Sequence, residues 1–116
     1  MPVIVTSEQQ LSPELQQGLV KLYDSSPEFS HGSEALEKGQ DVLASHGAWY
    51  VGWFNGKAVA AIMASPSADN RLLHNIVVHP ANRGRGIADG LVSEACRLER
   101  EQGNTHFIAG CTAIAR

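Results

Sequence analysis

The sequence predicts a mixed α/β domain whose elements follow in the order strand, helix, helix, strand, strand, strand, helix, strand. Two observations carry this prediction. The dipeptide Asn55-Gly56, a strong hairpin signal, separates two runs of aromatic, β-branched and other apolar residues. Farther along, an amphipathic run over 84–102 lies between two apolar segments, which is the pattern of a right-handed strand–helix–strand crossover. One sheet should therefore contain both antiparallel and parallel pairs.

The first half of the chain supplies one strand and two helices. The β-branched residues at 3–5 predict a short strand. A Ser-Pro-Glu start and apolar residues that recur on one face predict a helix over 13–23. The turn-forming residues of 24–32 indicate a loop. A second helix is expected to start after Ser33 and to stop at Gly47, with a weaker pattern that Gly39 weakens further.

The second half supplies most of the sheet. Residues 48–54 and 57–64 form the predicted hairpin, and 65–70 have turn chemistry. The strand predicted over 71–79 is almost continuously apolar, so we expect it to be central. Because a helix separates it from the last predicted strand, 105–111, these two strands should pair in parallel.

Composition narrows the classes of function. With 116 residues, 43% of them hydrophobic, we expect one domain over 1–116. The net charge of −3 argues against a general nucleic-acid binder. The sequence shows neither a signal peptide nor an apolar run that could span a membrane, so a cytoplasmic location is the expectation. Cys96 and Cys111 are expected to be reduced core thiols, and no cysteine or histidine cluster predicts a metal site.

A basic glycine turn opens the last predicted helix, directly after the strand end and Pro80. An anion at this turn would meet the amides of the first helical turn, the positive end of the helix dipole, and the guanidinium groups of Arg83 and Arg85. Two phosphate-binding patterns do not fit. The chain lacks G-x-x-x-x-G-K-[ST], and Gly90 comes one residue too late for G-x-G-x-x-G.

The remaining pattern, Arg83-x-x-Gly86-x-Ala88, resembles motif A, R/Q-x-x-G-x-G/A, of the GCN5-related N-acetyltransferase (GNAT) superfamily. The predicted element order is also similar to that fold. The resemblance implies that the turn amides hold the diphosphate of coenzyme A, which here means Asn82, Arg83, Gly84, Arg85, Gly86, Ile87, Ala88 and Asp89. A bulge or splay in the preceding strand would free main-chain groups for the pantetheine arm, at Ile76, Val77 and Val78.

The resemblance implies an acetyl-CoA-binding N-acetyltransferase that acts on a small-molecule or protein amine. In this family a tyrosine on a helix after the fifth strand often protonates the leaving thiolate. The sequence ends at Arg116, so that helix and the last two strands of the fold are not expected within it, and either the sequence is a truncated form or the fold is trimmed. In a trimmed fold, a homodimer or a regulatory protein partner would cover the exposed sheet face. No catalytic acid or base is assigned from the sequence.

Two histidines are expected to lie close to this site. His74 has the same predicted strand parity as Ile76 and Val78, near the expected thioester. It either accepts a proton from the substrate or is a partly buried strand residue bonded to a neighbour. His79 either bonds the ligand or the backbone, or is a solvated loop residue.

Other aromatic and acidic residues have structural interpretations. Three aromatic residues on the first hairpin strand are expected to pack across the sheet rather than line a substrate pocket; they are Trp49, Tyr50 and Trp53. Three carboxylates of the last helix are expected to form a solvated face: Glu94, Glu99 and Glu101.

A narrower resemblance supports a different function. The short length and the segments 27–30, 53–55 and 73–86 are similar to the PanZ (PanM) group of GNAT-like proteins. Members of that group bind acetyl-CoA and promote maturation of aspartate 1-decarboxylase. Two functions therefore remain open, an N-acetyltransferase and a non-catalytic acetyl-CoA-dependent regulator.

Overall fold

The computed structural model describes residues 3–26, 28–67, 70–103 and 107–109. The elements follow in the predicted order, which confirms the mixed α/β fold. They are β1 (Ile4–Glu8), α1 (Pro13–Asp24), α2 (Gly32–Ala44), β2 (Ala48–Phe54), β3 (Lys57–Ser67), β4 (Asn70–Val78), the short 3₁₀ helix η1 (Pro80–Asn82), α3 (Ile87–Glu101) and β5 (Phe107–Ala109). Every helix within the described ranges is too short or too polar to cross a membrane.

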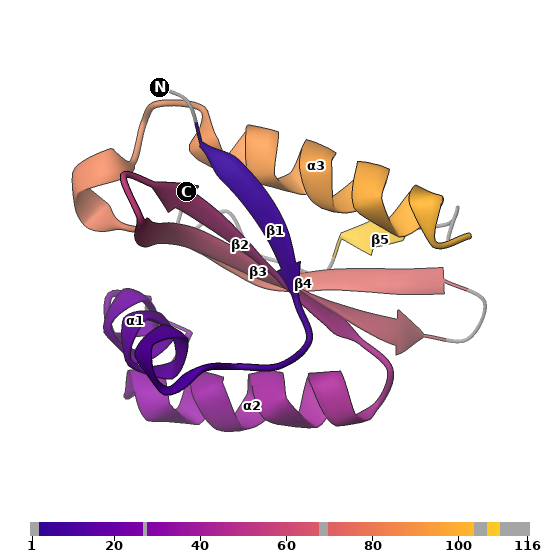
Figure 1. Ribbon diagram of the computed structural model, residues 1–116, viewed down its shortest axis with the longest axis horizontal. Coiled ribbons are helices and arrows are strands. Elements are labelled where there is room, and N and C mark those ends of the chain that lie inside the picture. The colour runs from indigo at the N-terminus through magenta and orange to yellow at the C-terminus, as the bar shows by residue number, and fades with distance from the viewer. Residues whose placement is uncertain (1–2, 27, 68–69, 104–106, 110–116) are drawn as a thin grey trace.

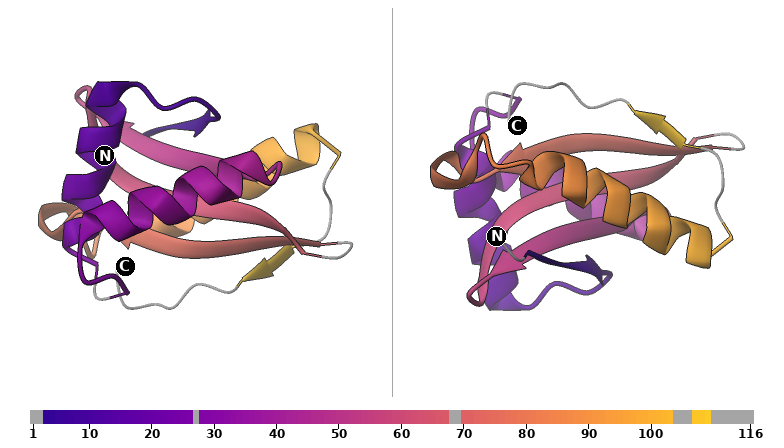
Figure 2. Two further views of the ribbon diagram at one scale, coloured as in Figure 1. Left: turned by 90° about the horizontal axis from the view of Figure 1, so that it is seen from below. Right: turned by 90° about the horizontal axis from the view of Figure 1, so that it is seen from above.

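One sheet organises the chain, with the strand order β1-β2-β3-β4-β5. The first four strands pair antiparallel, and β5 pairs parallel to β4. The predicted crossover through α3 is thereby confirmed. Helix α3 covers one face of the sheet, and α1 and α2 cover the other (Figures 1 and 2).

The core consists of two layers, because alternate residues of each strand face opposite sides. Between the sheet and α3 lie fully buried residues such as Ile76 and Leu91. Between the sheet and the α1–α2 pair lie Leu19, Trp49 and Val77. Strand β4 thus contributes Val77 to one layer and Ile76 to the other.

The turn between β3 and β4 is tighter than the sequence predicts. The strands continue through the predicted turn, so that Pro66 lies opposite Arg71. The first residue of β2, Ala48, pairs with Ala64, so β3 has no β2 neighbour beyond Ala64. This part of β3 is therefore an edge, where a proline is tolerated. The turn prediction for 65–70 was therefore wrong at 65–67 and at Asn70, which belong to the two strands.

A bulge interrupts β4 at Asn75. Val77 pairs with Ala61 and His74 pairs with Met63, so β4 has one residue more than β3 between these pairs. Asn75 takes a left-handed conformation with φ of 53°, which asparagine tolerates better than most residues.

The bulge changes which face each side chain occupies. His74 lies on the α1–α2 face, like its partner Met63, whereas Ile76 and Val78 pack in the α3 layer. The predicted shared parity of His74 with Ile76 and Val78 was therefore wrong, because an extra residue separates them.

The carboxylates of α3 do not all face solvent. Glu99 is fully buried, and its two oxygens accept from Nε and Nη2 of Arg71 on β4 at 3.2 and 3.1 Å. A buried carboxylate needs such a partner, so the prediction of a solvated Glu99 was wrong. Glu94 and Glu101 pair with Arg97 on the exposed side, as their solvated positions predict.

Two helical glycines have opposite surroundings. A Cβ on Gly39 would lie 2.1 Å from Cζ3 of the fully buried Trp49, so glycine here makes room for the indole. A Cβ on Gly18 would meet no atom within 4 Å.

Substituting each glycine by alanine tests this packing. Gly39→Ala should lower the free energy of unfolding by roughly 1 to 3 kcal/mol, because the methyl group overpacks the core. Gly18→Ala should raise it by up to about 1 kcal/mol through helix propensity. Urea unfolding measures both values, and changes of the same sign would contradict the packing described.

Candidate functional site

The turn between β4 and α3 exposes backbone amides. Gly84 and Gly86 have φ of 78° and 76°, in the left-handed region that favours glycine. Gly86 is the N-cap residue of α3, and no side chain caps this helix. The first N–H groups of α3 therefore lack an acceptor from a capping side chain, and together with the helix dipole they make a site for an anion.

The two arginines of the turn have different roles. Arg83 donates from Nε to the carbonyl of Val78 at 3.0 Å and from Nη2 to the carbonyl of Ser25 at 3.3 Å. Its guanidinium group thus connects the turn to β4 and to the end of α1 through Nε and Nη2. Arg85 is exposed and has no partner among the described residues. Its charge is available to a ligand.

The C-terminal half of β4 has an open edge. Within the described ranges, β5 pairs with β4 only at Arg71, Leu72 and Leu73. On the other side, the N–H of His79 donates to Val59 of β3 at 2.8 Å. Since antiparallel strands alternate the direction of their main-chain groups, those of Ile76 and Val78 point to the open edge.

The same alternation places Val77 differently from Ile76 and Val78. The main-chain groups of Val77 turn toward β3, and its side chain packs under α1 and α2. Val77 therefore has no polar group to offer at the open edge. The carbonyl of Val78 is already bonded to Arg83, which leaves the Val78 N–H and both groups of Ile76.

A chain of polar side chains surrounds the bulge. Ser65 Oγ lies 2.6 Å from Nε2 of His74, whose Nδ1 contacts Oδ1 of Asn75. Asn75 donates from Nδ2 to Oε2 of Glu28 at 3.4 Å. Burial lowers the pKa of His74, and the neutral ring fits this chain, with Nδ1 donating and Nε2 accepting. His74 is thus bonded to neighbours at both nitrogens, as one of its two interpretations predicts.

Tyr23 holds the same bulge from the α1 side. Its hydroxyl donates to the carbonyl of Asn75 at 2.6 Å and accepts from Nε1 of Trp49 at 3.3 Å. Burial raises the pKa of Tyr23, so the hydroxyl remains a donor. The left-handed turn at Asn75 is therefore fixed by a fully buried contact.

Glu28 is the functional candidate that sequence reasoning missed. Its Oε1 is buried and has no hydrogen-bond partner among the described residues. A carboxylate oxygen in this state provides a place for an incoming N–H donor. The available signal was the polar pair His74-Asn75 within an apolar strand, although the sequence alone does not connect that pair to Glu28.

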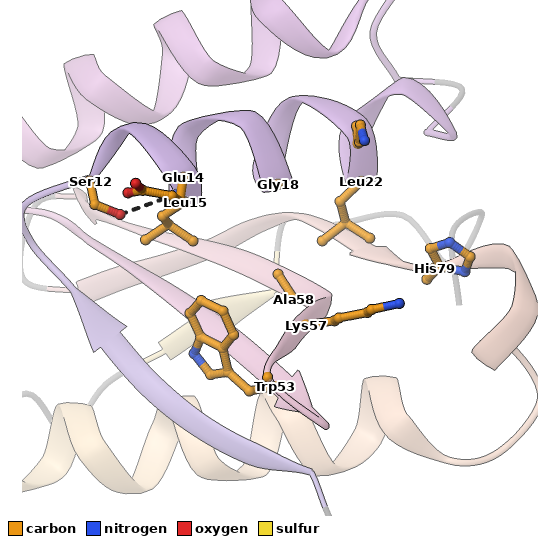
Figure 3. A pocket seen from close by; sticks show the side chains of 11 residues that line it. Ser12, Glu14, Leu15, Gly18, Leu22, Trp53, Lys57, Ala58 and His79 are labelled. Carbon is orange, nitrogen blue, oxygen red and sulfur yellow. Dashed lines mark hydrogen bonds between the residues drawn. The ribbon is translucent and has the colours of Figure 1, made fainter.

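The aromatic residues of β2 divide between core and pocket. Trp49 and Tyr50 are fully buried, which confirms that they pack across the sheet. Trp53 is half-buried and lines a pocket of 390 Å³ between α1 and the end of the β2–β3 hairpin (Figure 3). His79 lines the same pocket, and its Nδ1 accepts the N–H of Ala81 at 3.1 Å.

Cysteine occurs at two positions of the chain, Cys96 and Cys111. Cys96 is a free, half-buried thiol whose pKa is raised by burial. Cys111 lies outside the described residues, as does the predicted strand beyond Phe107–Ala109.

Comparison with solved structures shows the same fold at low sequence identity. The aminoglycoside N-acetyltransferase AAC(6')-Iy, in complex with a CoA bisubstrate analogue, has a TM-score of 0.73 and 17% identity, over 97% of this chain and 82% of that chain. An aminoglycoside 6'-N-acetyltransferase complexed with coenzyme A has a TM-score of 0.75 and 19% identity, over 87% of this chain and 57% of that chain. The ribosomal-protein-alanine N-acetyltransferase of Brucella melitensis biovar Abortus 2308 has a TM-score of 0.72 and 15% identity, over 97% of this chain and 82% of that chain.

Family membership comes from the sequence. No curated protein sequence matches the chain. A sequence model of the acetyltransferase (GNAT) family matches residues 15–114, which span most of the chain. These residues include the glycine turn, the bulge and the open edge of β4. The chain belongs to the GNAT acetyltransferase family.

Proposed function

We propose that the chain binds acetyl-CoA at the turn before α3 and along the open edge of β4, and transfers the acetyl group to an amine. The observation that carries this proposal is the uncapped N-terminus of α3 behind the left-handed Gly84 and Gly86. Family membership supports it, and so do structural neighbours solved with coenzyme A or a CoA analogue.

The residues of the turn fit a diphosphate. Neither Gly84 nor Gly86 has an atom within 4 Å of where a Cβ would lie, so a ligand can approach the backbone closely. Arg85 adds a charge-assisted contact. The proposed diphosphate site contains Asn82, Arg83 through its backbone, Gly84, Arg85, Gly86, Ile87, Ala88 and Asp89.

The open edge fits the arm that follows the diphosphate. Pantetheine contains two amides, and an extended ligand can pair with strand groups as another strand would. Ile76 offers an N–H and a carbonyl there, and Val78 offers an N–H. The arm would thus run from the turn toward the bulge at Asn75.

The bulge is where the acceptor amine would react. Acetyl-CoA supplies the activated acetyl group, and the amine must lose a proton as the new C–N bond forms. Oε1 of Glu28 is the buried carboxylate oxygen that can accept this proton, and Asn75 orients the carboxylate through Oε2. We therefore assign Glu28 as the proposed base.

The acceptor is sought among amines of different chemistry. Structural neighbours are named for aminoglycosides and for ribosomal-protein alanine, so a panel contains an aminoglycoside, a peptide with N-terminal alanine, a lysine peptide and a polyamine. Release of free thiol from acetyl-CoA measures transfer. Binding without thiol release from any amine would contradict transferase activity, and cleavage of the aspartate decarboxylase precursor then tests the regulatory alternative.

One prediction concerns the charge of Arg85. Arg85→Ala should weaken coenzyme A binding by roughly 1 to 3 kcal/mol, because a charge-assisted phosphate contact is lost. Arg97→Ala on the exposed face of α3 is the matched control and should bind normally. Calorimetric titration measures both, and equal affinities would show that Arg85 does not contact the ligand.

Another prediction concerns the backbone of Gly86. Gly86→Val should abolish detectable binding, because a β-branched residue is strained at φ of 76°. Gly90→Ala is the control, since Gly90 lies within α3 and a Cβ there meets nothing within 4 Å. Circular dichroism establishes that each variant is folded. A folded valine variant with normal affinity would rule out the proposed turn geometry.

A further prediction concerns Glu28, and its test uses the acceptor amine that the panel identifies. Glu28→Gln should reduce the rate of transfer about 100-fold or more, the usual scale for loss of a general base, with coenzyme A affinity unchanged. Glu37→Gln, on the exposed side of α2, should leave the rate unchanged. A Glu28→Gln variant with a normal rate would remove Glu28 from the mechanism while leaving the coenzyme site intact.

A further inference from the structure

We propose that the pocket between α1 and the β2–β3 hairpin binds a small organic carboxylate with a flat apolar body. Its volume of 390 Å³ lies in the range of small-molecule sites. The pocket lies on the α1 side of the sheet, and apart from His79 it shares no lining residue with the turn and the edge proposed for acetyl-CoA. It is therefore a second site.

The middle of the pocket suits a flat apolar group. Leu15 and Leu22 project from α1, and Trp53 and Ala58 face them from the hairpin (Figure 3). The indole N–H of Trp53 donates to Oγ1 of Thr6 at 2.8 Å, which fixes the ring. Because the Trp53 ring is already held in place, it loses little conformational entropy when a planar ligand packs against it.

One end of the pocket is cationic. Lys21, Lys57 and His79 are among the residues that line the pocket, and Figure 3 shows the Lys57 ammonium group extending beneath Leu22 toward His79. Within the described part of the chain, neither lysine forms an ion pair or hydrogen bond. Because Nδ1 of His79 accepts from Ala81, the proton of a neutral ring is on Nε2, which adds a donor.

The opposite end has the opposite charge. Glu14 and Ser12 lie there, and Ser12 is occupied as the N-cap of α1, accepting from the N–H of Leu15 at 3.2 Å. A ligand with one negative group would therefore orient its carboxylate toward Lys57 and His79 and away from Glu14. This asymmetry selects a monoanion with its charge at one end.

Gly18 keeps the α1 side of the pocket open. It lines the pocket between Leu15 and Leu22, and a Cβ there meets no atom within 4 Å. An alanine fits this space and leaves most of the pocket free, whereas a leucine projects into it. The two substitutions make a matched pair on a helix that tolerates both.

The test uses indole-3-acetate as the probe, with the neutral indole-3-acetamide as its control, in calorimetric titrations of the full chain. The acetate should bind, and the acetamide should bind roughly tenfold more weakly, because it lacks the charge. Lys57→Gln should weaken acetate binding by a similar factor and leave acetamide binding unchanged. Gly18→Leu should abolish binding of both, while Gly18→Ala retains it.

Three results would overturn the proposal. They are absence of acetate binding at millimolar concentration, equal binding of acetate and acetamide, and normal binding to a folded Gly18→Leu variant. Coenzyme A titration of the same variants separates this test from the proposed function. Because Gly18 and Lys57 lie outside the proposed coenzyme site, their variants should bind coenzyme A like the unaltered chain.

Discussion

The left-handed backbone at Asn75 is the constraint on which the site depends. It inserts one residue into β4, immediately after the last residues that pair with β5. The part of β4 on its C-terminal side thus keeps its ladder to β3, while no strand among the described residues pairs with its other edge. The buried hydroxyl of Tyr23 holds the Asn75 carbonyl, so packing against α1 maintains this geometry. A single buried contact thereby connects the helical layer to the edge that would receive a ligand.

The same bulge explains why polar groups gather beside that edge. It moves His74 to the α1–α2 face, where Ser65 and Asn75 satisfy both ring nitrogens. Asn75 in turn reaches the carboxylate of Glu28. The resulting chain is polar within an otherwise apolar strand, and it ends at a buried oxygen without a described partner. The left-handed conformation of Asn75 thus brings its side chain within hydrogen-bond distance of Glu28.

Local chemistry made much of this fold predictable. The Ser12 cap, the Asn55-Gly56 turn and the apolar stripe of α3 each act within a few residues, and all three elements form where expected. The glycine turn was predictable for the same reason, because left-handed backbone and an uncapped helix follow from Gly84 and Gly86.

Two errors came from contacts between residues distant in the sequence. Glu99 belongs by periodicity to a polar helix face, but Arg71 on β4 draws it into the core. The parity of His74 failed because the bulge depends on Tyr23, 52 residues from Asn75. A sequence pattern of period two contains no information about such an insertion.

The central claim is that the turn and the open edge of β4 together bind coenzyme A. It is tested most directly by titrating isotope-labelled protein with coenzyme A and following the backbone amide signals by nuclear magnetic resonance. We predict saturable shifts at Gly84, Gly86, Ile76 and Val78, with smaller shifts at Gly18 and Gly56 in the α1 pocket. Absence of shifts at millimolar coenzyme A, or shifts confined to the α1 pocket, would contradict the account.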